Sequence, residues 1–600
     1  MLIFLSFLIL FFSCYYVFLS MPLWDYDFWW HIATGRYILE TGHVPDHDPF
    51  SFTSALAENK NLFPLHEAVI LKNYWLSQII FYLVYKTFGD AGMIFLRSSI
   101  LLLILVLVFW GLKREKVRFY IIFVFLFMLF NTFLTFVGER PVLFSFLLSV
   151  IVFFILDSYR KTRNKTIWLL VPVMVLWANL HAGYMIGILI IGAFLAGETL
   201  GIIFKKDPYS TKDMIIFYLI AVSSILVTGL NPNGYDTILY RLSDEARLLP
   251  LDSQEYQNVF VLYWNKIRAV DFGYIALLVL SVVVLVFRAR RMALSRIILL
   301  VGLCAMSLSA VRFMAFFMII GIVIVGREIE YFAEKLFSEK LRNERIQTVL
   351  PQLFAVFILI SSVLFLVGVV KFEWLKFNKA VKFSVPQGAV NFIEKNHLEG
   401  NIFNDFGFGG YLSWRLYPWK KNFVDTRWLN NTVITEYKWV YGTVDSVRGN
   451  APSPGKLPLW ERILDHYDIE IIFLNTLGIQ GGVPPLLLKL LEGKEWRPVY
   501  ADPISIVFVR DTPENQEIIQ RNAVQKDIVY NLLIVRAINM TIITNNPLFV
   551  KDLGDIFIKT GRFEDAIKAY EIAASRLPRL HPERQRLESM KEQWKQEIHQ

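Results

Sequence analysis

Long apolar runs separated by short polar loops make up most of the first 370 residues. A helix needs about 20 apolar residues to cross a hydrocarbon core of about 30 Å, and most of these runs approach that length. They predict eleven membrane-spanning helices, near residues 2–20, 92–112, 119–137, 142–157, 167–180, 184–204, 213–230, 272–287, 297–311, 313–326 and 348–370. The first run lacks the basic start and the small-residue cleavage site of a signal peptide, so we expect it to remain as a helix.

The loops between these helices alternate between basic and non-basic sequences. The basic loops are those at 113–118, 160–165, 205–212, 288–296 and 327–345. The loops without a basic excess are those at 138–141, 180–183 and 231–236 and the turn at Arg312. Because basic loops remain on the cytoplasmic side, we expect a cytoplasmic N-terminus. The first exterior loop is then 21–75, and the loop at 231–271 and the chain after about 371 are exterior too. In a bacterium we expect the inner membrane, with this side facing the periplasm or the cell exterior.

After residue 371 the pattern changes to short apolar strands alternating with helices. This alternation predicts an exterior α/β domain over 371–512 with a largely parallel sheet. The tail, 513–600, has the pattern of amphipathic helices. Its segment 546–579 places Gly554, Tyr570 and Pro578 at positions typical of a tetratricopeptide repeat, although an ordinary helical hairpin is the alternative. Since one repeat cannot bury its own apolar face, we expect it to stack on neighbouring helices or on a protein partner.

Composition supports the membrane assignment for residues 1–370. The chain is 55% hydrophobic, with a mean hydropathy of +0.45, which is more apolar surface than a soluble core can bury. The net charge of +9 comes from Lys and Arg in the loops and does not indicate nucleic acid as a partner. The two cysteines, Cys14 and Cys304, fall in predicted helices and imply no disulfide framework.

The stretch "DYDFWWH", residues 25–31, brings two carboxylates directly behind the first helix. A partly desolvated aspartate at this depth is a stronger general base, which suits a reaction between a lipid-borne and a water-borne substrate. Asp25 and Asp27 could instead hold a divalent cation such as Mg²⁺ or Mn²⁺. A third possibility is that they only solvate the helix end or cap the next helix.

Positively charged or ionisable side chains recur on the same predicted side: His31, Arg36, Arg140, His181 and Arg312. Ionisable residues at membrane depth are costly, so they usually pair or line a site, and arginine suits phosphate well. Together they predict a site for a membrane lipid that carries phosphate. Each residue considered by itself also has an explanation without a lipid site. Arg140 could form an ion pair with Glu139, and His31 could be an aromatic side chain at the membrane interface.

Several motifs of this chain match those of a known group of proteins. They are the stretch 25–53, "RP" at 140–141, "NLHAG" at 179–183, "NPNG" at 231–234, "NDFGFGGYL" at 404–412 and "NFVDTRW" at 422–428. With them the chain resembles bacterial multi-spanning proteins related to the GT-C glycosyltransferases, the polyprenyl-phosphate-sugar-dependent mannosyltransferase-like superfamily. This resemblance implies a polytopic α-helical GT-C-like membrane fold. It also implies a polyprenyl-phosphate sugar donor, an acceptor on a glycan, lipid or protein, and a catalytic carboxylate in the acidic motif. One departure is Tyr74, where such proteins often carry an acid; Glu67 could replace it.

On that resemblance, Asp27 or Asp25 deprotonates an acceptor hydroxyl, with Asp27 slightly favoured. The hydroxyl attacks the anomeric carbon with inversion, and the cations stabilise the leaving phosphate.

In the exterior domain, Asp405, Asp425 and Arg427 come after predicted strands, where α/β sheets form crevices. We expect these three residues either to form a surface that recognises the acceptor or to contribute only to the stability of the domain. The alternative function for the whole chain is a non-catalytic envelope scaffold that binds partners through its α/β and tail regions. A transporter is disfavoured because the sequence shows no internal repeat.

Overall fold

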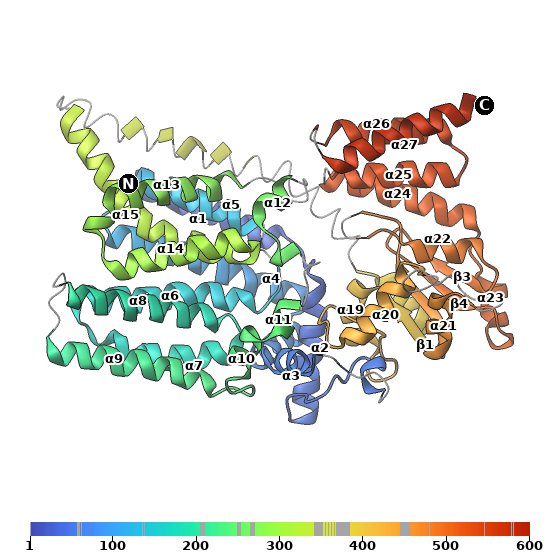
Figure 1. The fold of residues 1–600 in the computed structure, drawn as a ribbon, viewed down its shortest axis with the longest axis horizontal. Helices are drawn as coiled ribbons and strands as arrows, with labels where there is room; N and C mark the ends of the chain where they lie inside the picture. The colour runs from blue at the N-terminus through green and yellow to red at the C-terminus, as the bar shows by residue number, and fades with distance from the viewer. Residues whose placement is uncertain are drawn as a thin grey trace.

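The computed structural model consists of a helical bundle, a small α/β layer and a helical tail (Figure 1). It describes residues 2–56, 61, 63–134, 136, 138–204, 210–248, 254–264, 271–340, short pieces between 352 and 367, 385–444, 457–478, 481–544, 546–577, 579 and 581–599. The predicted helix at 348–370 therefore lies largely outside the described residues.

The helical bundle contains the apolar helices predicted from the sequence. Its members are α1 (Leu2–Ser20), α4 (Trp75–Arg114), α5 (Phe119–Leu134), α6 (Val142–Thr162), α7 (Leu170–Leu180), α8 (Tyr184–Ile203), α9 (Thr211–Leu226), α13 (Phe272–Arg288), α14 (Leu294–Ser309) and α15 (Met314–Lys340). By length and composition, five segments among the described residues are able to cross a membrane: Trp75–Arg114, Val142–Thr162, Tyr184–Ile203, Thr211–Gly229 and Phe272–Arg291. Shorter apolar helices accompany them, and the chain is a multi-pass membrane protein.

The chain between the first two predicted spans is more structured than a loop. It contains α2 (Tyr26–Thr41) and α3 (Pro64–Lys72), and α4 begins at Trp75 rather than near residue 92. A kink divides α4 at Gly89, whose φ of 59° is a conformation that glycine adopts readily. The part of α4 before the kink packs against α2, and α2 lies between the bundle and the α/β layer (Figure 1).

The α/β layer has a four-stranded mixed sheet in the order β1-β2-β4-β3. The strands are β1 (Asn401–Asn404), β2 (Ile469–Asn475), β3 (Trp496–Ala501) and β4 (Ser505–Arg510). Only β1 and β2 pair in parallel, while the other two pairings are antiparallel, so the prediction of a largely parallel sheet is wrong. The segment 421–425, which the sequence pattern predicts as one more strand, does not join the sheet, and β4 pairs antiparallel with both of its neighbours. Asn422 forms a single parallel bridge with Ser51, from the stretch that follows α2.

Helices cover both faces of this sheet. They are α18 (Gln387–Lys395), α19 (Gly409–Leu416), α20 (Asn431–Tyr441), α21 (Leu459–His466) and α22 (Pro485–Glu492). On one face, Ile471 and Phe473 share a hydrophobic core with α18, α19 and the side chains of Phe28 and Trp29 from α2. The Trp29 and Tyr411 rings meet edge to face with centroids 4.8 Å apart. The start of α2 is therefore part of the core of the α/β layer.

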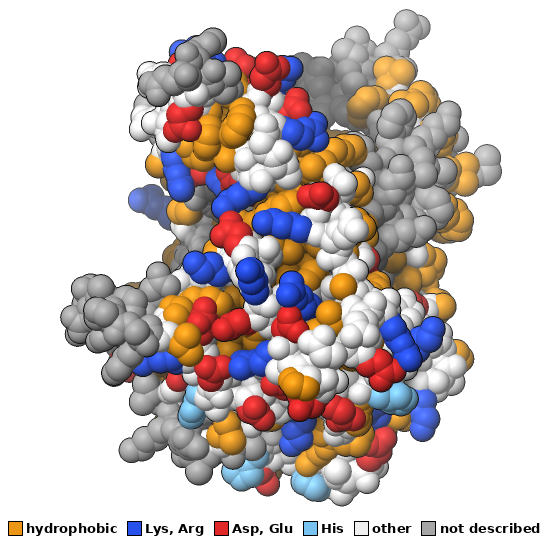
Figure 2. Space-filling model, turned by 90° about the vertical axis from the view of Figure 1, so that its right-hand side faces the viewer, with side chains coloured by type: hydrophobic (Ala, Val, Ile, Leu, Met, Phe, Trp, Pro, Cys, Tyr) orange, Lys and Arg blue, Asp and Glu red, His pale blue; other side chains and the backbone are white. Residues whose placement is uncertain are grey.

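The tail consists of helices, as predicted. Its members are α23 (Gln516–Asn522), α24 (Lys526–Thr544), α25 (Pro547–Lys559), α26 (Phe563–Ser575) and α27 (Pro582–His599). Helices α25 and α26 form a hairpin in which Gly554 faces the Tyr570 ring so closely that a Cβ would lie 2.4 Å from it. The helix-turn-helix is confirmed, whereas its assignment as a tetratricopeptide repeat stays a prediction, and Pro578 lies outside the described residues. The right-hand side of Figure 1, where the tail and the α/β layer lie, carries intermixed acidic and basic side chains (Figure 2).

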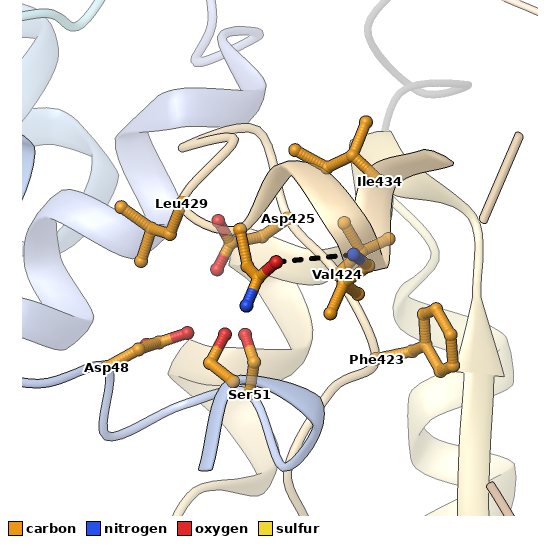
Figure 3. Close-up of a pocket in the computed structure, with 10 residues that line it drawn as sticks. Asp48, Ser51, Phe423, Val424, Asp425, Leu429 and Ile434 are labelled. Atoms are coloured by element: carbon orange, nitrogen blue, oxygen red, sulfur yellow. Dashed lines mark hydrogen bonds between the residues drawn. The ribbon is translucent and has the colours of Figure 1, made fainter. Parts of the chain in front are cut away.

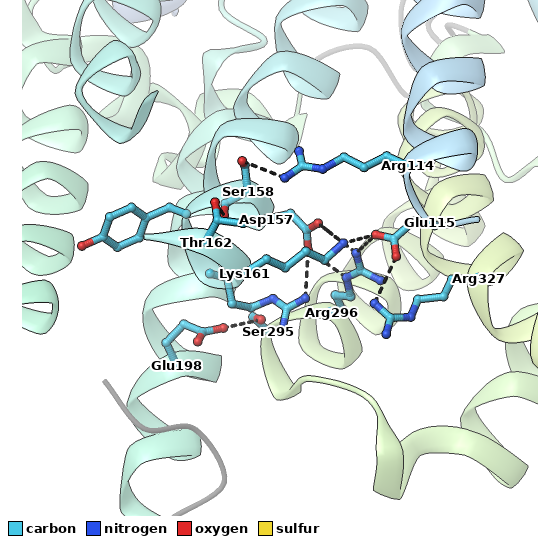
Figure 4. Close-up of polar contacts among 12 residues, drawn as sticks. Arg114, Glu115, Asp157, Ser158, Lys161, Thr162, Glu198, Ser295, Arg296 and Arg327 are labelled. Carbon is cyan, nitrogen blue, oxygen red and sulfur yellow. Dashed lines mark hydrogen bonds and ion pairs between the residues drawn. The ribbon is translucent and has the colours of Figure 1, made fainter. Parts of the chain in front are cut away.

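A network of buried charges ties together helix ends at the end of the bundle that carries the basic loops (Figure 4). Arg296 of α14 donates from Nε to Asp157 Oδ1 of α6 at 2.9 Å and from Nη2 to Asp157 Oδ2 at 2.9 Å, and it also pairs with Glu115 at the end of α4. Arg327 of α15 contacts Glu115 at 3.0 Å. The side chains of Arg296, Asp157 and Glu115 are at most 6% exposed, so each charge depends on the others for compensation.

We expect Arg296→Leu to destabilise the protein by about 3 to 5 kcal/mol, because it leaves Asp157 and Glu115 buried with less compensation. Thermal unfolding in detergent, followed by helical circular dichroism, measures the change. Arg290→Leu, at an exposed position near the same end of the bundle, is the matched control. Equal unfolding temperatures for the two variants would show that the network does not stabilise the bundle.

The positive-inside pattern predicts that Lys116 is cytoplasmic and Lys395 exterior. Both positions are exposed, so single cysteines there, in a chain whose Cys14 and Cys304 are replaced by alanine, can report their side. A membrane-impermeant maleimide added to intact cells should label Lys395→Cys and spare Lys116→Cys until the membrane is opened. The reverse result would invert the orientation.

Candidate active site

The three consecutive residues Gly138, Glu139 and Arg140, between α5 and α6, surround Asp25. Asp25 is the N-cap of α2, and its Oδ1 accepts the Asp27 backbone N–H at 2.9 Å. Its Oδ2 accepts from Arg140 Nε at 2.6 Å. Gly138 approaches so closely that a Cβ there would lie 2.3 Å from Asp25 Oδ2. The expectation that one of the acids caps the next helix is confirmed for Asp25, which is also ion-paired.

Arg140 is shared by three carboxylates. Besides Asp25, it contacts Asp27 Oδ2 through Nη2 at 3.0 Å and Glu255 through Nη1. The side chains are 4% exposed for Asp25, 20% for Asp27 and 44% for Glu255. Asp27 is thus the carboxylate of the opening motif that a substrate can reach, while Asp25 is enclosed.

A side chain from the α/β layer completes the surroundings of Asp27. Its Oδ1 accepts from Trp30 Nε1 at 3.2 Å and from the Thr426 hydroxyl. Thr426 belongs to the "DTR" segment, about 400 residues along the chain. The site is therefore assembled from α2, the loop before α6 and the α/β layer.

Burial raises the pKa of Asp25 to about 7. The Arg140 charge opposes this rise, while the negative charges of Asp27 and Glu139 add to it. Asp25 consequently takes up a proton at a higher pH than an exposed aspartate does. Since Asp25 shares Arg140 with Asp27, its protonation changes how strongly the guanidinium is drawn to Asp27.

Tyr74, the residue that departs from the resembled pattern, lies between two histidines. Its ring centroid is 5.3 Å from that of His31 and 5.5 Å from that of His181. His181 Nδ1 accepts the Gly183 N–H at 2.8 Å, which leaves Nε2 to carry the proton. Burial lowers the pKa of His181 to about 3 and that of His31 well below its usual value. The lowered pKa of both rings argues against a positive charge on them near pH 7, and their place in a phosphate site stays a prediction.

Arg312 and Arg241 differ from Arg140 in their contacts with carboxylates. Within the described part of the chain, neither has a carboxylate within 4.0 Å, and Arg312 Nε is buried without a hydrogen-bond partner. The Arg312 guanidinium lies 4.1 Å over the Tyr256 ring. Besides burial, the charges of Arg241 and Arg312 both act to lower the pKa of His181, which places the three groups in one region.

Sequence reasoning did not select Arg241, Glu255 or Tyr256, which lie in the predicted exterior loop at 231–271. Arg241 lies in α10 (Asp236–Leu242), and the other two in the turn η4 (Gln254–Tyr256). The available signal was their position on the same predicted side as Asp25.

The remaining candidates have partners of their own. Arg36 donates to the Tyr417 carbonyl at 3.1 Å and stacks on Trp414, so it joins α2 to α19. Glu67, the possible replacement for the missing acid, accepts from Asn61 at 2.7 Å. Asp405 caps a short turn by accepting the Gly407 N–H at 2.9 Å, and burial raises its pKa to about 6.

Asp425 and Arg427 are buried and face each other. Arg427 Nε donates to Asp425 Oδ1 at 2.9 Å, and its Nη2 donates to Asp48 at 2.7 Å. The adjoining cavity, lined by Asp48, Ser51, Asp425 and Asn430 among others, has a volume of about 10 Å³ (Figure 3). This is room for about one water molecule and not for a sugar. The arrangement favours the stability role for these residues, and acceptor recognition there stays a prediction.

The donor set does not fit a Mg²⁺ or Mn²⁺ site. Among the residues that the structure describes, no three His, Cys, Asp or Glu side chains converge in a way that could hold a metal ion. The guanidinium of Arg140 lies between the carboxylates of Asp25 and Asp27, where a bridging cation would bind. A metal held by these two residues would have to displace Arg140.

Comparison with solved structures finds entries that align over most of this chain. The oligosaccharyltransferase of Archaeoglobus fulgidus tethered to an acceptor peptide aligns at 11% identity over 90% of this chain and 86% of its own, with a TM-score of 0.49. Its apo form aligns at 12% identity over 78% and 69%, with a TM-score of 0.46. ArnT from Cupriavidus metallidurans, bound to undecaprenyl phosphate, aligns at 11% identity over 84% and 97%, with a TM-score of 0.38.

These neighbours are GT-C glycosyltransferases, the class that the sequence resembles. No protein-family model matches the sequence, and no curated protein matches it. Since all three TM-scores are below 0.5, a function for this chain has to rest on its own site.

Proposed function

We propose that this chain is a GT-C-type membrane glycosyltransferase that moves a sugar from a polyprenyl-phosphate donor to an acceptor hydroxyl. The observation that carries the proposal is one assembly of complementary groups. A reachable carboxylate, Asp27, and two arginines that form no ion pair within 4.0 Å among the described residues, Arg241 and Arg312, lie on the predicted exterior side of the membrane domain. Such a site can accept a proton and bind a phosphate in the same reaction.

Asp27 is the general base in this scheme. It takes the proton from the acceptor hydroxyl as that oxygen attacks the anomeric carbon of the donor sugar. The bond between the anomeric carbon and the phosphate oxygen breaks, a glycosidic bond forms, and polyprenyl phosphate leaves with the bonding electrons. Attack opposite the leaving group inverts the anomeric carbon. Asp25, which is enclosed and caps α2, holds Arg140 in place rather than taking the proton.

The leaving phosphate binds Arg312 and Arg241 rather than Arg140. Arg140 already faces Asp25, Asp27 and Glu255, so its charge is compensated. Among the described residues Arg312 forms no ion pair within 4.0 Å, although the Glu255 charge acts on it, and an incoming phosphate would compensate its buried guanidinium further. Neutral His181 can add a hydrogen bond from Nε2.

The domain assignment follows from the same scheme. The membrane part, 1–370, carries the reaction, the part at 371–512 faces the exterior or periplasm and supplies Thr426, and the tail, 513–600, offers a surface for a protein partner. A bacterial inner membrane is the proposed location, where the donor lipid would be within reach of α2.

An envelope scaffold remains the second candidate, because α24 exposes an apolar stripe. Its exposed members are Ile528, Val535, Ile538 and Ile542. They recur every three to seven residues and so share one face of the helix. A scaffold would bind partners through such a face and would not need Asp27.

Asp27→Asn should lower the rate of sugar transfer by about 10² to 10⁴, because the amide keeps the size but cannot take the proton. Transfer is measured in proteoliposomes with a panel of polyprenyl-phosphate sugars. Glu40→Gln, at an exposed position of α2, is the matched control and should keep the parent rate. Parent activity in Asp27→Asn would support the scaffold.

Arg312→Ala and Arg241→Ala should raise the KM for the polyprenyl-phosphate sugar about tenfold or more, since each removes a charged contact to the phosphate. The KM for the acceptor should change little. A larger effect on the acceptor KM than on the donor KM would place the phosphate elsewhere.

A chelator should leave transfer unchanged, because Arg140 lies where a bridging metal would bind. The measurement is the transfer rate before and after treatment with EDTA, followed by added Mg²⁺ or Mn²⁺. Loss of activity that Mn²⁺ restores would show that a metal displaces Arg140 in the working enzyme.

A further inference from the structure

A fully buried ion pair lies beside the proposed site and takes no part in the scheme above. Arg97 of α4 pairs with Glu139, and both side chains are 0% exposed. Burying two charges costs free energy that their attraction often does not recover. Ionisable groups at membrane depth are also usually tied to function. The hydrogen bonds of Arg97 and Glu139 show which backbone segment this ion pair fixes.

Arg97 holds the end of α1. Its Nη2 donates to the carbonyls of Phe18, at 2.8 Å, and Met21, and its Nη1 donates to the carbonyl of Pro22 at 3.3 Å. The last carbonyls of a helix have no partner within the helix. A side chain from α4 therefore fixes the point at which the chain leaves α1.

Glu139 holds the next residues of the same segment. Its Oε2 accepts the backbone N–H groups of Trp24, at 3.3 Å, and Asp25, at 3.4 Å, while Oε1 faces Arg97. Together the two side chains fix the backbone from Phe18 to Asp25. The neighbouring Gly138 leaves the space that the Asp25 carboxylate fills.

We propose that Arg97 and Glu139 are positioning residues of the transfer reaction, which set the place of the Asp25 carboxylate and, through Arg140, that of Asp27. This inference rests on the proposed function. The chain of contacts is continuous, from Arg97 to Glu139, to the Asp25 backbone, to Arg140 and to Asp27.

The pair also acts on Asp25 through charge. The negative charge of Glu139 is one of the causes that raise the pKa of Asp25. When Asp25 is protonated at lower pH, Arg140 is drawn more strongly to Asp27 and makes it a weaker base. Activity should therefore fall as the pH falls through the pKa of Asp25. Removing the Glu139 charge favours the Asp25 carboxylate and moves this fall to lower pH.

The test uses the full-length protein and two readouts. Infrared difference spectra between acid and alkaline pH, compared with those of Asp25→Asn, isolate the carboxyl band of Asp25. The pH dependence of kcat gives the second readout. In Glu139→Gln, we expect both midpoints to move down by about one pH unit or more. Glu328→Gln, which breaks the Arg288–Glu328 contact near the other end of the bundle, is the matched control and should move neither.

Two further variants cover the case in which Glu139→Gln does not fold. The double variant Arg97→Met with Glu139→Leu removes both charges and should also lower the Asp25 midpoint. Gly138→Ala forces the Asp25 carboxylate away and should lower kcat about tenfold or more, with the donor KM unchanged.

Unmoved midpoints in the folded Glu139 variants, with a parent kcat in Gly138→Ala, would overturn the proposal. If no donor supports transfer by the parent protein, the proposed function fails, while the infrared midpoint still decides whether the pair controls Asp25.

Discussion

The arrangement of the site depends on one requirement, that the charge of Arg140 be compensated at the edge of an apolar bundle. Arg140 lies between α5 and α6 and faces carboxylates from two other segments, Asp25 and Asp27 at the start of α2 and Glu255 in η4. A single guanidinium with its fixed fork of donors can hold several carboxylates in defined directions. It therefore fixes how α2 and η4 meet the bundle.

Helix α2 connects the surroundings of Arg140 with the α/β layer. One side of its first turns carries the acids that face Arg140. Phe28 and Trp29 share a core with Ile471 and Phe473 of the sheet. A further link is the ion pair between Arg427 and Asp48, which is fully enclosed. Because the membrane part and the α/β layer share a core and buried charges, Thr426 can be held against Asp27 across a separation of about 400 residues. The catalytic proposal depends on these contacts.

The buried charges of the bundle serve different purposes at its two ends. At the end with the basic loops, Arg296, Asp157 and Glu115 compensate one another and tie helices together. At the end with the proposed site, compensation is uneven. Arg140 has three carboxylates, while Arg312 and Arg241 have no carboxylate within 4.0 Å among the described residues. Positive charge that ion pairs compensate less attracts an anion more strongly, and on this ground we propose that Arg312 and Arg241 bind the phosphate.

The sequence by itself determined the apolar helices, the basic loops, the helical tail and the two carboxylates directly behind the first helix. These features depend on local periodicity, on segment length and on the cost of placing charge near lipid. Only the tertiary structure decided the partners: Arg140 with Asp25, Asp27 and Glu255, Tyr74 between two neutral histidines, and Arg241 beside Arg312. It also decided that 421–425 bridges to Ser51 instead of joining a parallel sheet. The physical reason is that pairing, burial and pKa depend on which distant segments pack together, and no spacing along the chain specifies that packing.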